Sequence, residues 1–424
     1  LNDMYMVSGG NEFNHDSKML QDRLYRNIGN GKFERSDALP EMLSSGLRAV
    51  PFDYDKDGDM DLFVRGRLVP GNYPMPAKSY ILENVSKKGA PKFSDVTRDI
   101  APGLAELGMV SSAVWTDIDK DGAIDLIVVG EWLPISVFKN INGSFENVTK
   151  ALALENTTGW WSSIQQADFD QDGDMDYIIG NNGLNFKYKA NEKETFDVYL
   201  NEFDKNSTND IVFSYFNGGK KLPLRGRECS SQQMPAIATK FATYDAFSRA
   251  SLEDVYTEQA LESALHYQVK TFASIYLENK NESFVVHKLP MLAQVSAINQ
   301  ILIEDFDGDG HLDAVVAGNL ARQRRVLPFH GGALAAGQPG LCPGSQRRGA
   351  GAKTGFPVER LQADVGYAQS NALLAASSGE VLEVNIADGQ TTVKLPCWSI
   401  ATSGYRWSLA VIVFTANSAP SGEA

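Results

Sequence analysis

Carboxylates recur at fixed spacing in four short segments of the sequence, and this is the feature best suited to chemistry. Each segment has Asp at positions 1, 3, 5 and 9 and Gly at position 6, and two segments also have Asp at position 7. The aspartates are Asp53, Asp55, Asp57, Asp59 and Asp61; Asp117, Asp119, Asp121 and Asp125; Asp168, Asp170, Asp172, Asp174 and Asp176; and Asp305, Asp307, Asp309 and Asp313. Because Gly permits a sharp turn, the carboxylates at positions 1, 3 and 5 converge on one point, where a carbonyl of position 7 and the Asp at position 9 complete a shell of hard oxygen ligands. The pattern predicts a Ca²⁺ site in each segment, whereas Mg²⁺ suits it less well because it prefers a strict octahedron.

Two other interpretations of these segments are weaker. An EF-hand would need Glu at position 12 and helices on both sides. Position 12 is instead Val64, Val128, Ile179 or Val316, each in an apolar run of strand-forming residues. A solvated Asp-Gly turn without an ion explains any single segment, but four copies with the same spacing and similar flanks favour a metal loop.

A fifth segment departs from the pattern. It carries Glu202, Asp204, Asn206 and Asp210 at the ligand positions, and Ser207 stands where the other segments have Gly. We leave open whether this weaker loop holds a metal.

The flanks of the loops repeat as well and predict strands. A short apolar stretch precedes each loop, and an apolar run follows it and closes on Gly66, Gly130, Gly180 or Gly318. With the later Asn-Gly-type turns, each unit reads as about four short strands. Asp3 and the residues after it match Asp61 and its strand, so we expect the chain to begin inside a repeat.

Four-strand units of about 50 residues predict an all-β fold, a β-propeller of about six to seven blades. The intervals between loops are uneven, and the short one between Asp168 and Glu202 suggests compressed or shared strands. Gln233–Lys240 and Leu252–Phe272 read as helices. We therefore predict blades over 1–218, a helical insertion over 219–270, a further blade over 271–320 and an atypical tail over 321–424.

The acidic loops followed by strand-forming runs resemble FG-GAP/VCBS repeats, the calcium-bearing propeller repeats also found in integrin α chains. Three longer stretches, which begin at Arg67, Gly130 and Thr158, resemble bacterial relatives of cartilage acidic proteins. The resemblance covers about residues 1–320. It implies an exported protein of Bacteroidetes-type bacteria, located outside the cell, in the periplasm or at the outer cell surface.

Composition excludes several classes of protein. The chain has 53 acidic and 39 basic residues and a net charge of −14, which argues against a nucleic-acid partner. No apolar run is long enough for a transmembrane helix. The segment from Ala321 to Lys353 has no acidic residue, and the tail is either a linker with a small β segment or not the natural continuation of the chain.

No enzyme motif is evident, and we predict a non-catalytic protein. Its five His residues lie outside any hydrolase or phosphate-loop motif. Trp132, Trp160 and Trp161 either pack in the core or form a binding surface for sugar rings or protein. The resulting prediction is a calcium-stabilised module that binds protein or glycan. An accessory or weakly catalytic module of a polysaccharide-processing system and a structural domain of a large surface protein are the alternatives.

Overall fold

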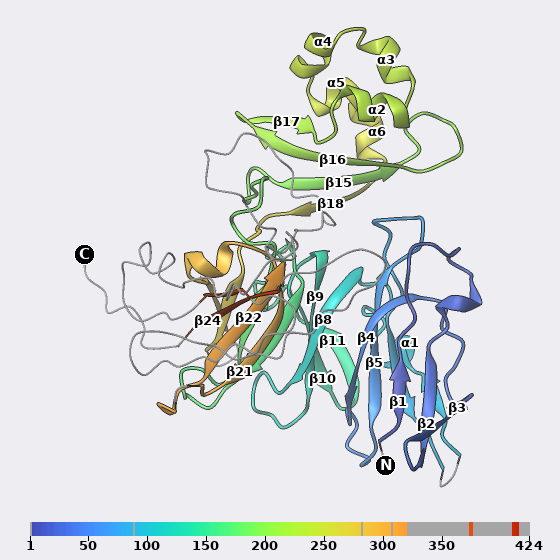
Figure 1. Ribbon diagram of the computed structural model, residues 1–424, viewed down its shortest axis with the longest axis vertical. Helices are drawn as coiled ribbons and strands as arrows, with labels where there is room; N and C mark the ends of the chain where they lie inside the picture. The colour runs from blue at the N-terminus through green and yellow to red at the C-terminus, as the bar shows by residue number, and fades with distance from the viewer. Residues whose placement is uncertain are drawn as a thin grey trace, which may run out of the picture. The chain divides into compact units, whose positions relative to one another are not determined.

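Short antiparallel strands form six sheets in the residues that the computed structural model describes, which are 2–87, 90–280, 283–306, 308–319, 373–375 and 409–414 (Figure 1). The first three sheets contain β1 (Met4–Met6), β2 (Arg23–Gly29) and β3 (Lys32–Ser36); β4 (Ser45–Phe52), β5 (Asp61–Leu68), β6 (Tyr80–Asn84) and β7 (Phe93–Asp95); and β8 (Met109–Thr116), β9 (Asp125–Leu133), β10 (Ser136–Ile141), β11 (Ser144–Asn147) and β12 (Gly159–Trp160). The other three contain β13 (Ser163–Ala167), β14 (Asp176–Gly180), β19 (Ile275–Asn279) and β20 (Phe284–Lys288); β21 (Ile298–Glu304), β22 (Asp313–Asn319), β23 (Leu373–Ala375) and β24 (Leu409–Phe414); and β15 (Phe196–Asn201), β16 (Asp210–Asn217), β17 (Lys220–Pro223) and β18 (Leu265–Val269).

The chain divides into two units, each made of several segments. One unit comprises Leu1–Ser162, Tyr188–Phe272 and Asn279–Phe284, and the other comprises Ser163–Lys187, Ala273–Glu278 and Val285–Ala424. The prediction of an all-β fold is confirmed for the described residues, and the helices are confined to short segments.

Neighbouring sheets of the first unit share cores, which explains why their strands are apolar on both faces. Phe63 of β5, Trp115 of β8 and Phe138 of β10 belong to one buried cluster. The Phe63 and Trp115 rings meet edge to face at 6.3 Å between centroids. Burial of such large side chains stabilises a fold by about 2–3 kcal/mol each, so contact between sheets is a main source of stability here.

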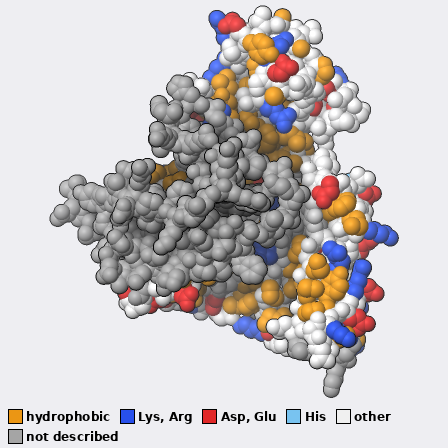
Figure 2. Space-filling view, in the orientation of Figure 1, with side chains coloured by type: hydrophobic (Ala, Val, Ile, Leu, Met, Phe, Trp, Pro, Cys, Tyr) orange, Lys and Arg blue, Asp and Glu red, His pale blue; other side chains and the backbone are white. Residues whose placement is uncertain are grey.

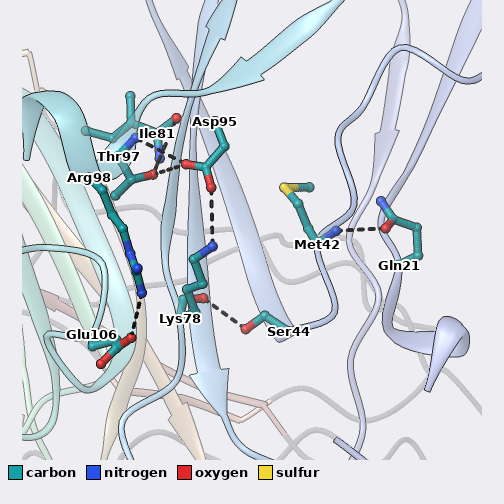
Figure 3. Close-up of polar contacts among 9 residues, drawn as sticks. All are labelled: Gln21, Met42, Ser44, Lys78, Ile81, Asp95, Thr97, Arg98 and Glu106. Atoms are coloured by element: carbon teal, nitrogen blue, oxygen red, sulfur yellow. Dashed lines mark hydrogen bonds and ion pairs between the residues drawn. The ribbon is translucent and has the colours of Figure 1, made fainter. Parts of the chain in front are cut away.

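An Asx-Val-Thr motif in two of the sheets ties the end of the outer strand back to the third strand. The Asp95 carboxylate accepts hydrogen bonds from the N–H and the hydroxyl of Thr97, and the Thr97 hydroxyl accepts the Ile81 N–H at 2.7 Å (Figure 3). In the next sheet, Thr149 accepts the Val137 N–H at 3.0 Å in the same way. Lys78 adds an ion pair to Asp95 at 3.3 Å (Figure 3).

The Gly that closes each post-loop strand is required by close backbone approach. A Cβ on Gly66 would lie 2.3 Å from the Lys78 carbonyl oxygen, and one on Gly130 would lie 2.1 Å from that of Met109. Gly180 and Gly318 are equally crowded by Ile298 and Ala297. Any side chain at these positions would force neighbouring strands apart.

The N-terminal sheet repeats the blade plan from its second strand onwards. Asp3 accepts the Asn27 N–H at 2.8 Å, just as Asp61 accepts the Asn84 N–H at 2.8 Å. Asp3 therefore occupies the place of a position-9 Asp. Figure 2 shows hydrophobic side chains at the surface over the region where Figure 1 draws β1 and β4, and Met4, Met6 and Leu47 of these strands are exposed.

One sheet is inserted inside a blade, which corrects the predicted arrangement. Strand β14 pairs with β19, so the chain between 180 and 275 interrupts the sheet that contains the third acidic loop. The insertion includes the sheet β17-β16-β15-β18. Its last strand in the chain, β18, pairs with its first, β15. The short interval between the third and fifth loops thus reflects an insertion, and the predicted compressed or shared strands are wrong.

The helices of the insertion are shorter than predicted. They are α2 (Arg227–Gln233), α3 (Ala236–Lys240), α4 (Tyr244–Arg249), α5 (Leu252–Tyr256) and α6 (Glu258–Glu262). The predicted helix Gln233–Lys240 is broken at Met234, which is extended before Pro235. The predicted helix Leu252–Phe272 is wrong beyond Glu262, because β18 pairs with β15. Within it, Thr257 has a φ of 65°, which separates α5 from α6.

The helices pack on one face of the inserted sheet. Leu252 and Val255 of α5 lie in a buried cluster with Tyr199 of β15 and Val212 of β16. Elsewhere, the short helices are α1 (Thr97–Ile100), η1 (Lys18–Leu20) and η2 (Met291–Gln294). The predicted atypical tail 321–424 lies outside the described residues except for β23 and β24, and β24 pairs with β22.

Candidate metal centres

All five acidic segments are turns between two paired strands. The four strong loops connect β4 to β5, β8 to β9, β13 to β14 and β21 to β22, and the fifth connects β15 to β16. Position 12 of each strong loop lies in a strand, which confirms that these loops are not EF-hands. Strand pairing on both sides fixes where each turn begins and ends, and so places its carboxylates at one end of a sheet.

The loops share a backbone conformation that is left-handed at positions 4 and 6. In the second loop, Lys120 has a φ of 60° and Gly122 a φ of 82°. The fifth loop keeps this conformation although its position 6 is not Gly, since Ser207 has a φ of 67°. A residue with a Cβ is strained there by roughly 1–2 kcal/mol, which shows that the loop shape is imposed by more than the Gly.

Two hydrogen bonds within each loop bring its carboxylates inward. The position-1 carboxylate accepts the N–H of position 6, as in Gly122 to Asp117 at 2.9 Å. The position-5 side chain accepts the N–H of position 7, as in Ala123 to Asp121 at 2.7 Å. The remaining loops have the equivalent bonds at Asp53 and Asp57, Asp168 and Asp172, Glu202 and Asn206, and Asp305 and Asp309.

The position-9 Asp is a buried anchor between its loop and the sheet. Asp125 accepts the Ile118 N–H at 3.0 Å with one oxygen and the Asn140 N–H at 2.7 Å with the other. Asp61 makes the same two bonds, to Tyr54 and Asn84. Asp176, Asp210 and Asp313 likewise accept the N–H of position 2 of their loops.

Three of the loops bring ligand atoms together among the described residues. Carboxylate oxygens lie within 4.8 Å of one another in three groups, which are Asp53, Asp55 and Asp57; Asp117, Asp119 and Asp125; and Asp168, Asp170 and Asp172. Asp61, Asp121 and Asp176 are not in these groups, and neither are the predicted extra ligands Asp59 and Asp174. In the fourth loop, Asp307 lies outside the described residues.

Several buried carboxylate oxygens of the loops are left without a hydrogen-bond donor. One oxygen each of Asp53, Asp59, Asp168 and Asp204 is buried and accepts no hydrogen bond. A buried, unpaired carboxylate oxygen is costly, by about 1–3 kcal/mol or more. A cation would satisfy these oxygens, so the residues present fit a hard divalent ion such as Ca²⁺.

The electrostatics within the loops also favour a bound cation. Burial raises the pKa of Asp61 and of Asp125 to about 6, although backbone N–H donors lower it, and nearby carboxylates raise it further. Burial and then the charges of Asp57 and Asp55 raise the pKa of Asp59. Because clustered carboxylates disfavour one another's ionised form, a bound divalent cation would oppose these shifts.

Neighbouring loops are joined by the side chain at position 4. Lys56 of the first loop donates a hydrogen bond to the carbonyl of Gly122 in the second. Gln171 of the third loop donates to the carbonyl of Gly310 in the fourth, at 2.8 Å. The first and second loops are therefore in contact within one unit, and the third and fourth are in contact within the other.

Sequence reasoning missed two kinds of residue around the loops. Asn140 at the end of the third strand donates its side-chain amide to the Tyr54 carbonyl of the preceding loop at 3.3 Å. Lys139 beside it forms an ion pair with Asp119. The recurring Asn after an apolar strand was a sequence signal for Asn140. The role of Lys139, in contrast, is revealed only by the strand pairing.

The aromatic residues divide between core and partly exposed positions. Trp132 and Trp161 are 3% and 1% exposed, so they pack in the core and are not available as a binding surface. Trp160 is half-buried, and its ring centroid lies 5.0 Å from that of Trp132. Trp132 has a φ of 63° and donates its indole N–H to the Tyr73 hydroxyl at 2.6 Å.

The sheets and loops define a repeat protein in which antiparallel four-strand units carry an acidic turn between their first two strands. An FG-GAP-like repeat is found at residues 117–179, which supports an FG-GAP/VCBS repeat protein and fits a propeller-like all-β fold. No curated protein matches the sequence. In the described residues, no helix combines the length and apolar character needed to cross a membrane.

The matched repeat bears on activity in a general way. FG-GAP repeats are generally non-catalytic and suggest a non-enzymatic binding or structural module. The matched range begins at Asp117 and ends at Ile179, so it contains the second and third acidic loops together with the strands between them.

Proposed function

We propose that this protein is a calcium-stabilised binding module that acts outside the cytoplasm and recognises protein or glycan without catalysis. One observation carries the calcium proposal. Asp53 and Asp168 each have a buried carboxylate oxygen without a hydrogen-bond donor, and each belongs to a loop in which three carboxylates have oxygens within 4.8 Å of one another.

The residues that would hold the ion are those at positions 1, 3 and 5 of the first and third loops, with Asp125 joining Asp117 and Asp119 in the second. A bound Ca²⁺ would supply positive charge and ordered oxygen coordination. The chain's own contribution is the turn, which the strands and the anchored position-9 Asp hold in place. This role is structural, because the loops join strands and contain no nucleophile paired with a base.

Location outside the cytoplasm is part of this proposal, and the openness of the loops supports it. Asp55, Asp57 and Asp121 are exposed, so water can reach the ions. Open sites of this kind match the weak dissociation constants of extracellular calcium modules, roughly 10⁻⁴–10⁻³ M. The exposed apolar side chains of the N-terminal strands and the half-buried Trp160 are the surfaces that support recognition of a partner.

Calcium dependence is tested by calorimetry of the purified chain in millimolar Ca²⁺, in Mg²⁺ and in EDTA. Calcium at about ten times its dissociation constant stabilises a protein by about 1.4 kcal/mol per site. We expect a higher Tm in Ca²⁺ than in EDTA, little effect of Mg²⁺, and a smaller calcium effect in Asp55→Asn. Glu155→Gln is the matched control, because Glu155 is exposed and outside the loops. An unchanged Tm in Ca²⁺ contradicts the proposal.

The binding role is tested separately with a glycan array and a pull-down from the native source. We expect calcium-dependent retention of one partner class. Turnover of a polysaccharide panel that is lost on mutating an Asp outside the five loops would instead show an enzyme.

A further inference from the structure

In the sheets of the first three loops, the third strand places one side chain opposite the position-9 Asp, and the charge of this side chain differs between the sheets. Leu62 pairs with Leu82, Leu126 with Phe138 and Tyr177 with Leu277. One residue further along each register, the position-9 Asp meets a charged side chain. Asp61 stands opposite Glu83, Asp125 opposite Lys139, and Asp176 opposite Glu278. Residues directly opposite in an antiparallel pair lie on the same face, so each of these side chains is directed to its acidic loop.

In the second loop this side chain already neutralises carboxylates. The Lys139 ammonium forms an ion pair with Asp119 at position 3 and lies 3.9 Å from the Asp121 carboxylate at position 5. The Asp119 side chain is only 4% exposed. Solvent therefore screens this pair weakly, and the lysine stands where it can compete with a cation for Asp119, one of the loop's three grouped carboxylates.

In the first and third loops the corresponding side chain adds negative charge. Glu83 stands opposite Asp61 in the strand register of the first loop. Glu278 stands opposite Asp176 in the strand register of the third loop. Glu278 is itself held by His287 at 2.7 Å. These two loops therefore present one more carboxylate to a cation than their own residues supply.

We propose that Lys139 is a built-in cation that holds the second loop closed without calcium, so that this loop binds Ca²⁺ at least tenfold more weakly than the first and third. The inference rests on the proposed function, because it ranks sites that the proposal assigns to calcium. It makes the conformation of the second loop less dependent on calcium than that of the first and third. It also makes a single third-strand residue a determinant of the calcium affinity of each loop.

The test is a calcium titration by calorimetry, combined with melts in EDTA, of the full chain and two variants of opposite charge change. Lys139→Met should tighten one weak site at least tenfold and lower the Tm in EDTA. Glu83→Gln should weaken one tight site and leave the Tm in EDTA unchanged or higher. Glu155→Gln serves as the control for loss of a distant charge.

The outcomes separate the two proposals. Calcium binding that Lys139→Met leaves unchanged, together with an unchanged Tm in EDTA, overturns this inference and leaves the proposed function standing. Calcium binding by neither the wild type nor Lys139→Met overturns both. If Lys139→Met folds only in calcium, the inference is supported, and Lys139→Gln, which keeps a polar side chain of similar length, should show the same tightening in a milder form.

Discussion

The sheet β8–β11 and the inserted sheet β15–β18 both carry an acidic turn of the same backbone shape, yet they are stabilised by different surroundings. The blade sheet shares its core with a neighbouring sheet, and its position-9 Asp125 accepts a backbone N–H from Asn140. The inserted sheet is covered by helices, and its Asp210 accepts the side-chain amide of Gln233 from α2 at 3.0 Å. The turn is thus a local unit, whereas its anchor is whatever the fold places beside it.

The strongest test of this difference is a pair of core truncations. Phe138→Ala in the blade core and Leu252→Ala beneath the helices each remove a fully buried side chain. Such changes cost about 2–5 kcal/mol. If the two regions are separate cores, hydrogen exchange should rise in β8–β11 for the first variant and in β15–β18 for the second. Equal loss of protection in both sheets from either variant would show one cooperative core.

Removing the position-9 Asp should destabilise the protein more in the blade sheet than in the inserted sheet. Asp125→Ala strands two buried N–H donors, at a cost of about 2–4 kcal/mol, because each unsatisfied buried donor costs about 1–3 kcal/mol. Asp210→Ala leaves only one backbone N–H donor, that of Phe203, without an acceptor, and it releases the Gln233 side chain. We expect a smaller loss, and Gln233→Ala should reproduce part of it. Urea denaturation in EDTA gives the comparison without metal, and a larger loss for Asp210→Ala would refute the ranking.

Buried acidic residues outside the loops also have different surroundings, and this difference should affect how stability depends on pH. Asp22 in the N-terminal sheet accepts hydrogen bonds from uncharged groups, the Tyr5 hydroxyl and the Ser8 N–H, and burial raises its pKa to about 6. Asp197 in the inserted sheet is instead paired with Lys221 at 3.0 Å and His266 at 2.9 Å.

Because the folded pKa of Asp22 is raised, its stabilising contribution is fully present below the unfolded value near 3.8 and is lost as pH rises through about 6. The change is at most about 3 kcal/mol, since one pKa unit corresponds to about 1.4 kcal/mol. Asp22→Asn should flatten this part of the stability profile. Chemical denaturation from pH 4 to pH 7 measures it, and a wild-type profile that the substitution leaves unaltered would exclude Asp22 as its source.

The smallest expected effect concerns position 6 of the loops. Gly122 has a φ of 82° with open space around its Cβ direction, so Gly122→Ser should cost about 1 kcal/mol through backbone strain alone. Ser207 has the same left-handed conformation, so Ser207→Gly should stabilise the fifth loop by a similar amount. Thermal melts of the two variants should shift in opposite directions, and shifts of the same sign would show that side-chain contacts of Ser207 dominate.

Much of the candidate site was predictable because its determinants are local. The spacing of Asp117, Asp119 and Asp121 around Gly122 sets the turn, and the apolar runs beside it set the strands. Less accurate was the helix predicted over Leu252–Phe272, because an apolar stretch such as Leu265–Val269 fits either a helix or a strand until its partner is known. Trp132 and Trp161 were ambiguous for a similar reason, since burial depends on neighbouring sheets.

By itself, the sequence determined that acidic turns recur between strands, because each turn is specified within nine residues by carboxylates, a left-handed position and hydrogen bonds between near neighbours. Only the tertiary structure decided that β14 pairs with β19 across an inserted sheet, and that Lys139 faces Asp119 while Glu83 and Glu278 face their own loops. Strand pairing joins segments far apart in the chain, and a charge acts on whatever it meets in space. The composition of a loop therefore predicts a metal site, but the register of a distant strand sets the charge beside it.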